Sequence, residues 1–138
     1  MSSKHIHLKM IQGVINRFSH NSFLLKGWSL SLMLAMFVLA VKNSQLLFVY
    51  LACFLVIPFW FLDGYYLYQE RLFRKLYDRV RKLPKSKIDF SMNTEVVKTD
   101  EYTWFKAIIS KTLVIFYGVI SFLIILVIIG IHLKKGGI

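Results

Sequence analysis

Three long runs without a charged residue dominate the sequence. They are GWSLSLMLAMFVLAV (27–41), LLFVYLACFLVIPFWFL (46–62) and TLVIFYGVISFLIILVIIGIHL (112–133). A helix of about 20 apolar residues crosses the ~30 Å hydrocarbon core of a bilayer. Soluble domains contain about 45–50% apolar residues, whereas 57% of this chain is hydrophobic. The sequence therefore predicts an all-α integral membrane protein with three transmembrane helices.

The apolar runs divide the chain into five expected segments. The first run is short, because a helix over 27–41 rises only about 22 Å, and the tight turn KNSQ joins it to the second run as an antiparallel hairpin. The expected segments are an N-terminal amphipathic cytosolic helix (1–26), a first transmembrane helix (27–41), a second transmembrane helix (46–68), a cytosolic helix and loop (69–106), and a third transmembrane helix (107–133).

The N-terminal segment shows apolar residues at helical spacing. Leu8, Ile11, Ile15 and Phe18 share one side of a helix over 4–23. Two interpretations follow. The helix lies in the membrane interface with its basic side toward lipid phosphates, or it packs on the cytosolic helix of this chain or of a neighbour. Polar residues suited to packing and hydrogen bonding favour the second interpretation, namely Asn16, Asn21 and Ser22.

The second span is expected to continue out of the membrane as a helix. Leu72, Leu76, Val80 and other apolar residues keep helical period after the apolar run ends. Pro84 predicts the end of this helix, and Pro58 predicts a kink within the span. Beyond it, Ile88, Phe90 and Met92 alternate as a short extended piece of a structured loop.

Lysine and arginine counts predict the orientation. Four lie before the first run, one in the turn at 42–45, eleven between 63 and 111, and two in the tail. The positive-inside rule then places the N-terminus and the 69–106 loop in the cytoplasm and the C-terminus outside. Trp28 and Trp104 are expected to anchor the interface, and membrane lipids are the first expected partners of the net +11 charge.

Asp63 follows the second apolar run directly, and a carboxylate at the edge of a bilayer suggests a functional site with a cationic partner. The expected partner is Arg17 or Lys26, because the hairpin returns both to this side of the membrane. Glu70 shares the helix face of Asp63 and is spaced to pair with Arg74. Asp63, Glu70, Arg17 and Lys26 are thus candidates either for a structural ion pair or for the mouth of a pore in an oligomer.

A basic face follows on the same helix. Its members are Arg71, Arg74, Lys75, Arg79, Arg81 and Lys82. Topology, lipid headgroups and solubility explain such a face, and docking of an acidic protein or a nucleotide-like ligand is the alternative. Binding of nucleic acid is not expected, since the aromatic residues follow the apolar stripe and not the basic one.

Residues for catalysis or metal binding form no recognisable pattern. The histidines (His5, His7, His20 and His132) are scattered, and Cys53 is the single cysteine. No phosphate-binding loop, dinucleotide fingerprint or zinc-protease motif occurs in the sequence. We therefore expect no enzymatic activity, no metal site and no cofactor.

The blocks IQGVINR, NSFLLKGW, LDGYYLYQERLFRKLYDRVR and IDFSM carry a resemblance. With them the chain resembles, over about residues 5–130, a family of short bacterial three-span membrane proteins. The resemblance implies a position beside TIR-like or other anti-phage components, and hence a link to defence. It carries over no functional residues.

These observations predict a homo-oligomeric inner-membrane protein that acts without catalysis. The expected function is a membrane effector of a defence system, which disturbs the membrane barrier when a cytosolic trigger docks. That trigger is a protein or a nucleotide-derived molecule. The alternative is a membrane anchor or scaffold that recruits a soluble partner enzyme and forms no pore.

Overall fold

This computed structural model describes residues 2–43, 45–99 and 103–136, and the regular structure found there is entirely helical. The elements are the helices α1 (Ser3–Asn43), α2 (Leu46–Arg81), α3 (Trp104–Ile108) and α4 (Lys111–Gly136), and the short 3-10 helices η1 (Lys85–Lys87) and η2 (Thr94–Val97). The expected all-α architecture is confirmed. The helices α1, α2 and α4 are each long and apolar enough to cross a membrane.

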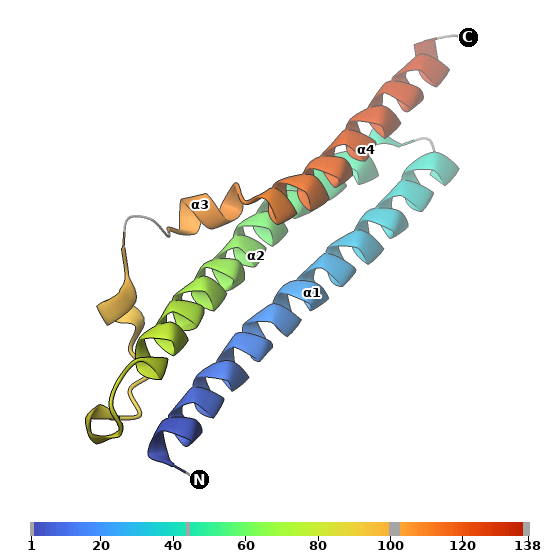
Figure 1. Cartoon of the computed structure of the whole chain (residues 1–138). Helices are drawn as coiled ribbons and strands as arrows, with labels where there is room; N and C mark the ends of the chain where they lie inside the picture. Colours follow the sequence, from blue (N-terminus) through green and yellow to red (C-terminus); the bar gives the residue numbers. More distant parts are fainter. Residues whose placement is uncertain (1, 44, 100–102, 137–138) are drawn as a thin grey trace.

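The two longest helices, α1 and α2, form an antiparallel hairpin (Figure 1). Each of these helices extends beyond its apolar run into polar sequence. The expected boundary at 26/27 lies inside α1, so the N-terminal helix and the first span are one helix. Likewise α2 continues from its apolar half into its basic half, and it passes through Pro58 without ending.

The apolar end of the hairpin (27–43 and 46–62) packs with α4 around a core of its own. That core contains Met33, Val49, Leu113, Tyr117 and Ile124, all buried. The opposite faces of these helices expose large apolar side chains, such as Phe54 at 72% and Val38 at 64%. Such extensive apolar exposure is unfavourable in water, and it suits a lipid environment.

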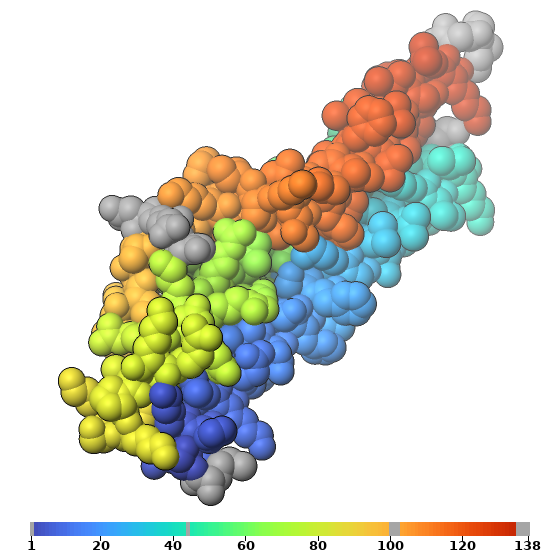
Figure 2. Space-filling model, in the orientation of Figure 1, coloured from blue at the N-terminus to red at the C-terminus, as the bar shows by residue number. Residues whose placement is uncertain are grey.

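The polar end of the hairpin (3–25 and 64–81, with 82–98) has a second core. Ile11 and Ile15 of α1 pack there against Leu76 and Val80 of α2. Of the two interpretations of the N-terminal segment, the structure therefore has the helix packed on its own chain. The segment after α2 covers this core with Ile88, Met92 and Val97, and it lies beside the start of α1 (Figure 2). Phe90 breaks the expected extended alternation with a φ of 56°.

The third transmembrane helix, expected from residue 107, begins at Lys111, and a separate short helix, α3, precedes it. Thr103 begins α3 by accepting a hydrogen bond from the backbone of Lys106. Residues 100–102 of the expected 69–106 segment lie outside the described residues. The chain then turns at Ile109 and Ser110 into α4, which packs mainly on α2 and leads to the end of the molecule opposite the N-terminus (Figure 1).

Two close contacts hold α3 against α2. The indole nitrogen of Trp60 donates a hydrogen bond to the carbonyl oxygen of Ile108 over 2.9 Å. This bond satisfies a carbonyl that the end of a helix leaves without a partner. Gly64 lies directly beneath α3, where an added Cβ would come within 2.6 Å of Ile108 Cγ1 and 3.3 Å of its Cα. A glycine here lets the two backbones approach.

Candidate functional site

A carboxylate lies buried between the two cores of the molecule. Asp63 of α2 is 0% exposed, at the level where the apolar end of the hairpin meets the polar end. An unpaired charge in such a place costs several kcal/mol. The surrounding residues therefore have to supply a counter-charge and hydrogen bonds.

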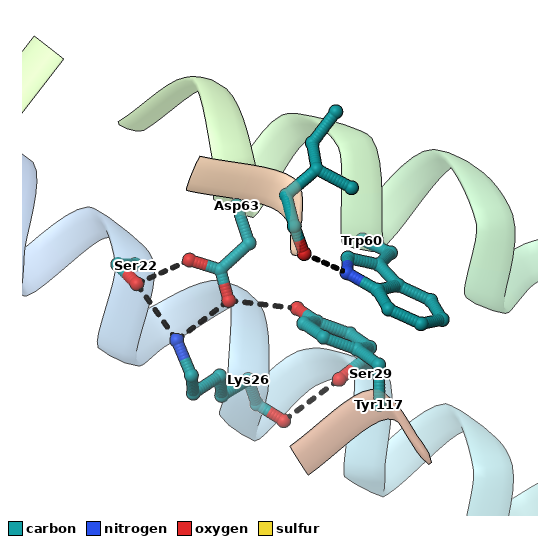
Figure 3. Close-up of polar contacts among 7 residues, drawn as sticks. Ser22, Lys26, Ser29, Trp60, Asp63 and Tyr117 are labelled. Atoms are coloured by element: carbon teal, nitrogen blue, oxygen red, sulfur yellow. Dashed lines mark hydrogen bonds and ion pairs between the residues drawn. The ribbon is translucent and has the colours of Figure 1, made fainter. Parts of the chain in front are cut away.

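Three donors from two other helices converge on Asp63 (Figure 3). Lys26 Nζ lies 2.6 Å from Asp63 Oδ2, and Tyr117 donates its hydroxyl proton to the same oxygen over 2.9 Å. Ser22 donates to the other carboxylate oxygen, Oδ1. The ammonium of Lys26 also donates to Ser22 Oγ over 2.8 Å. This network (Ser22, Lys26, Asp63 and Tyr117) joins α1, α2 and α4.

Local sequence explains how the network forms. Ser22 and Lys26 are four residues apart, so they share one face of α1. Tyr117 lies on the face of α4 that buries Leu113 and Ile120, and its hydroxyl therefore points toward the hairpin. The ring of Trp60 stacks on Tyr117, with a centroid distance of 5.6 Å and an interplanar angle of 13°. The stacking fixes the position of the tyrosine ring.

The chemistry of this network is that of a neutralised, buried ion pair. One lysine balances one aspartate, and the hydroxyls of Ser22 and Tyr117 complete the hydrogen bonding of the carboxylate. Asp63 and Tyr117 are buried, whereas Ser22 is half-buried and the Lys26 side chain is 20% exposed. A group that lines a path for ions must contact water, and Asp63 in this arrangement does not. Its direct effect is to hold three helices together.

The other two candidates for an ion pair lie elsewhere. Glu70 accepts two hydrogen bonds from Arg74, the shorter over 2.8 Å, as its spacing predicted. Arg17 is exposed and lies on the side of α1 near Phe18 and Phe73. Among the described residues it belongs to no ion pair. The partner of Asp63 is thus Lys26 and not Arg17.

Aromatic residues gather at the level of Asp63. Trp104 of α3 donates its indole proton to the carbonyl of Phe61 over 3.1 Å and packs edge-on against Tyr65, with ring centroids 5.8 Å apart. Trp28 of α1 lines a small hollow together with Tyr66. Trp28 and Trp104, which are the expected interface anchors, are 62% and 45% exposed.

The basic residues of the second half of α2 lie mostly at the surface. Arg74, Arg79, Arg81 and Lys82 are exposed, and Arg71 and Lys75 are half-buried. Carboxylates nearby pair locally, as Asp78 does with Arg81 over 3.7 Å. In the loop, the hydrogen bond to Glu95 raises the pKa of Lys98 above its ordinary value, so that this lysine stays charged. The polar end therefore keeps a large surplus of positive charge.

A second polar contact, which the sequence analysis did not anticipate, attaches the loop to α1. The Nε2 atom of buried His7 lies 2.9 Å from the carbonyl oxygen of Ser91, and the imidazole packs against the ring of Phe90 at 5.6 Å. The two residues are 84 positions apart in the sequence, so no local sequence pattern predicts the contact. For Tyr117 the sequence does indicate that a hydrogen-bond partner is needed, because its hydroxyl lies within an apolar span, but it does not indicate which partner.

The described part of the chain contains no group of three or more His, Cys, Asp or Glu residues that could hold a metal ion. The network itself is built from side chains on three helices. Comparison of the chain with protein-family models, with curated proteins and with solved structures finds no match.

Proposed function

We propose that this chain is a membrane-anchored docking protein, with three spans that hold its polar end at the cytoplasmic face of a bacterial inner membrane. The observation that carries the proposal is the complete burial of Asp63. The carboxylate of Asp63, where the apolar end of the hairpin meets the polar end, neutralises Lys26 and joins helices. It is therefore unavailable for an ion path in this arrangement.

The surface of the spans gives further support. Their exposed side chains are mostly large and apolar, as at Leu34, Phe54 and Phe122. A pore formed by copies of these helices needs a polar stripe to face its water. The serines at 29 and 121 instead donate hydrogen bonds to the carbonyls of Lys26 and Tyr117 within their own helices. Such spans suit an anchor that faces lipid.

The orientation of the proposed anchor rests on charge. Both the N-terminus and the basic residues of α2 belong to the polar end, and α4 leads away from it (Figure 1). Lysine and arginine are concentrated in the same part of the chain. The positive-inside rule places that part in the cytoplasm, where it is accessible to a soluble partner.

A second candidate function is the oligomeric defence effector that disturbs the membrane barrier. The observation in its favour is the broad apolar face of α4, with Gly118 and Gly130 at points where an added Cβ would meet no atom within 4 Å. A neighbouring helix can approach closely at such positions. In this version the polar end receives the trigger, and oligomer rearrangement follows.

The experiment that separates the two is the native mass of the tagged protein after gentle extraction from membranes of its own host. A docking protein should carry a soluble protein in fixed stoichiometry, and its overproduction should leave the membrane potential intact. A ring of identical chains without a soluble component, together with depolarisation of the cells, would contradict the docking function and support the effector.

A further inference from the structure

An apolar groove lies on the polar end of the hairpin, beside α1. Its volume is ≈ 720 Å³, in the range of binding sites for drug-sized ligands and peptide anchors. Its lining comes from α1, α2 and the loop that follows α2, namely Met10, Gly13, Val14, Phe18, Phe73 and Met92, with Arg17 beside them. We propose that this groove binds an acidic amphipathic segment of a soluble protein, whose apolar side chain enters the groove while its carboxylate pairs with Arg17. This inference rests on the proposed docking function and names the site.

The groove is open because of one residue in α1. Gly13 lies inside the helix, where glycine costs about 1 kcal/mol relative to alanine. A Cβ added at this position would meet no atom within 4 Å. The helix therefore lacks a side chain at the point where the groove is lined by α1. A larger side chain at position 13 is therefore expected to extend into the groove.

The floor of the groove is aromatic and preformed. The ring of Phe18 contacts those of Phe73 and Tyr66, with centroid distances of 5.7 and 6.0 Å. Methionines stand at its margins, and Met10 is 44% exposed. Unbranched, polarisable methionine side chains adapt to the shape of an entering apolar group. These features suit an aliphatic or aromatic anchor residue.

The positive charge around the groove indicates an acidic partner. Arg17 is exposed and has no ion pair within the described residues, whereas the carboxylates of Asp63, Glu70, Asp78 and Glu95 are paired inside this chain. The chain carries a net charge of +11. Such a surface attracts an acidic partner and repels a second copy of itself.

Distance argues against a lipid chain as the occupant. Along α1, Arg17 lies about 13 Å, and Met10 about 24 Å, beyond the level of Lys26, at 1.5 Å per residue. Lys26 marks the end of the apolar half of α1. An acyl chain whose headgroup stays in the bilayer surface does not reach a groove at that height, whereas a soluble protein does.

The test is site-specific photo-cross-linking in the membranes of the native host, followed by mass-spectrometric mapping of the cross-linked peptide. A benzophenone amino acid replaces Met10 in the full-length chain. The expected product joins position 10 to one identified soluble protein, at a segment that is acidic and has apolar residues at helical spacing. A product with a phospholipid, with a second copy of this chain or with a basic segment would overturn the proposal.

Variants of the groove sharpen the test. Gly13→Leu, which fills the groove, and Arg17→Glu, which reverses its charge, should each abolish the cross-link. Each should also weaken the binding of a synthetic peptide of the mapped segment by about tenfold or more. The matched control is Lys82→Glu, a charge reversal of an exposed lysine at the end of α2 that does not line the groove. It should change the affinity less than about threefold.

Failure of the groove and failure of the docking function give different results. If a soluble protein co-purifies but its cross-link and affinity survive Gly13→Leu, the docking function stands and the groove is not its site. If no soluble protein co-purifies with the unmodified chain, the docking function itself is contradicted. Equal melting temperatures of the Gly13→Leu, Arg17→Glu and unmodified proteins in detergent establish that the variants are folded.

Discussion

Lys26 and Asp63 form one ion pair, yet removal of either charge should have unequal effects on stability. Asp63 is 0% exposed and cannot reach water, whereas the Lys26 side chain is 20% exposed. We expect Lys26→Met to lower the free energy of unfolding by about 3–5 kcal/mol, because the buried carboxylate loses its counter-charge. Asp63→Asn should cost less, about 1–3 kcal/mol, because the lysine can extend toward solvent. Chemical unfolding in mixed micelles measures both.

The double variant Lys26→Met/Asp63→Asn provides the control for this asymmetry. Since neither charge remains, its loss of stability should be smaller than the sum of the two single losses, by about 0.5–3 kcal/mol. Additive losses would mean that the two side chains do not interact. If Asp63→Asn lowered the free energy of unfolding more than Lys26→Met does, Asp63 would not be the buried charge that depends on its counter-charge.

At the scale of single residues, the sequence predicted part of the network. The position of Asp63 after an apolar run, together with the hairpin, restricted its partner to Arg17 or Lys26. The choice between them depends on the rotation of α1 about its axis, which the packing of Ile11, Ile15 and Met33 fixes. Tyr117 could not be assigned, because nothing in the sequence sets the register of the last span against the second.

Among the elements, α2 and α3 approach each other closely at Gly64. Gly64→Ala places a Cβ 2.6 Å from Ile108 Cγ1 and 3.3 Å from its Cα, so the Ile108 side chain or the backbone of α3 has to shift. We expect a loss of about 1–3 kcal/mol and faster amide hydrogen exchange over residues 104–110. The matched control is Gly118→Ala in α4, where the added Cβ meets no atom within 4 Å. If both variants behave like the unmodified protein, α3 is not held by this contact.

The loop that follows α2 is attached to α1 through His7. We expect His7→Ala to destabilise the loop by about 1–3 kcal/mol, because the carbonyl of Ser91 loses its hydrogen bond and the ring of Phe90 loses its contact. Hydrogen exchange should accelerate over residues 88–98.

His5→Ala is the control for this prediction. His5 is exposed and contacts Ser2, at the start of the chain. Exchange in the loop should remain unchanged in this variant. Equal acceleration in both variants would indicate general loosening of α1 and would contradict a specific role of His7.

For the elements, the spacing of apolar residues predicted the helices well, whereas the charged residues predicted a helix boundary poorly. The apolar runs predicted the three long helices, and the spacing of Leu72, Leu76 and Val80 predicted the extension of α2. Lys26 and Gly27 suggested a boundary that does not exist, since tertiary packing on both sides of them keeps α1 helical. The separation of α3 from α4 depends on contacts with Trp60 and Gly64, which local sequence does not encode.

For the whole molecule, the distribution of lysine and arginine predicts which end faces the cytoplasm. In a Cys53→Ala background, Lys85→Cys should resist a membrane-impermeant maleimide in intact spheroplasts and react after permeabilisation. Lys134→Cys, near the end of α4, should react without permeabilisation. Both side chains are exposed in the structure, so neither result depends on burial. The reverse labelling pattern would contradict the proposed orientation.

The continuity of α1 gives the molecule a mechanical property. A helix from Ser3 to Asn43 is about 60 Å long, and its network contact with α2 and α4 lies at Lys26. Lys26 divides it into arms of about 35 and 25 Å. If α1 rotated by about 10° about the position of Lys26, its N-terminal end would move by about 6 Å and its C-terminal end by about 4 Å in the opposite direction. Because α1 is one uninterrupted helix, a displacement at its N-terminal end would reach its C-terminal end without a break in the helix to absorb it.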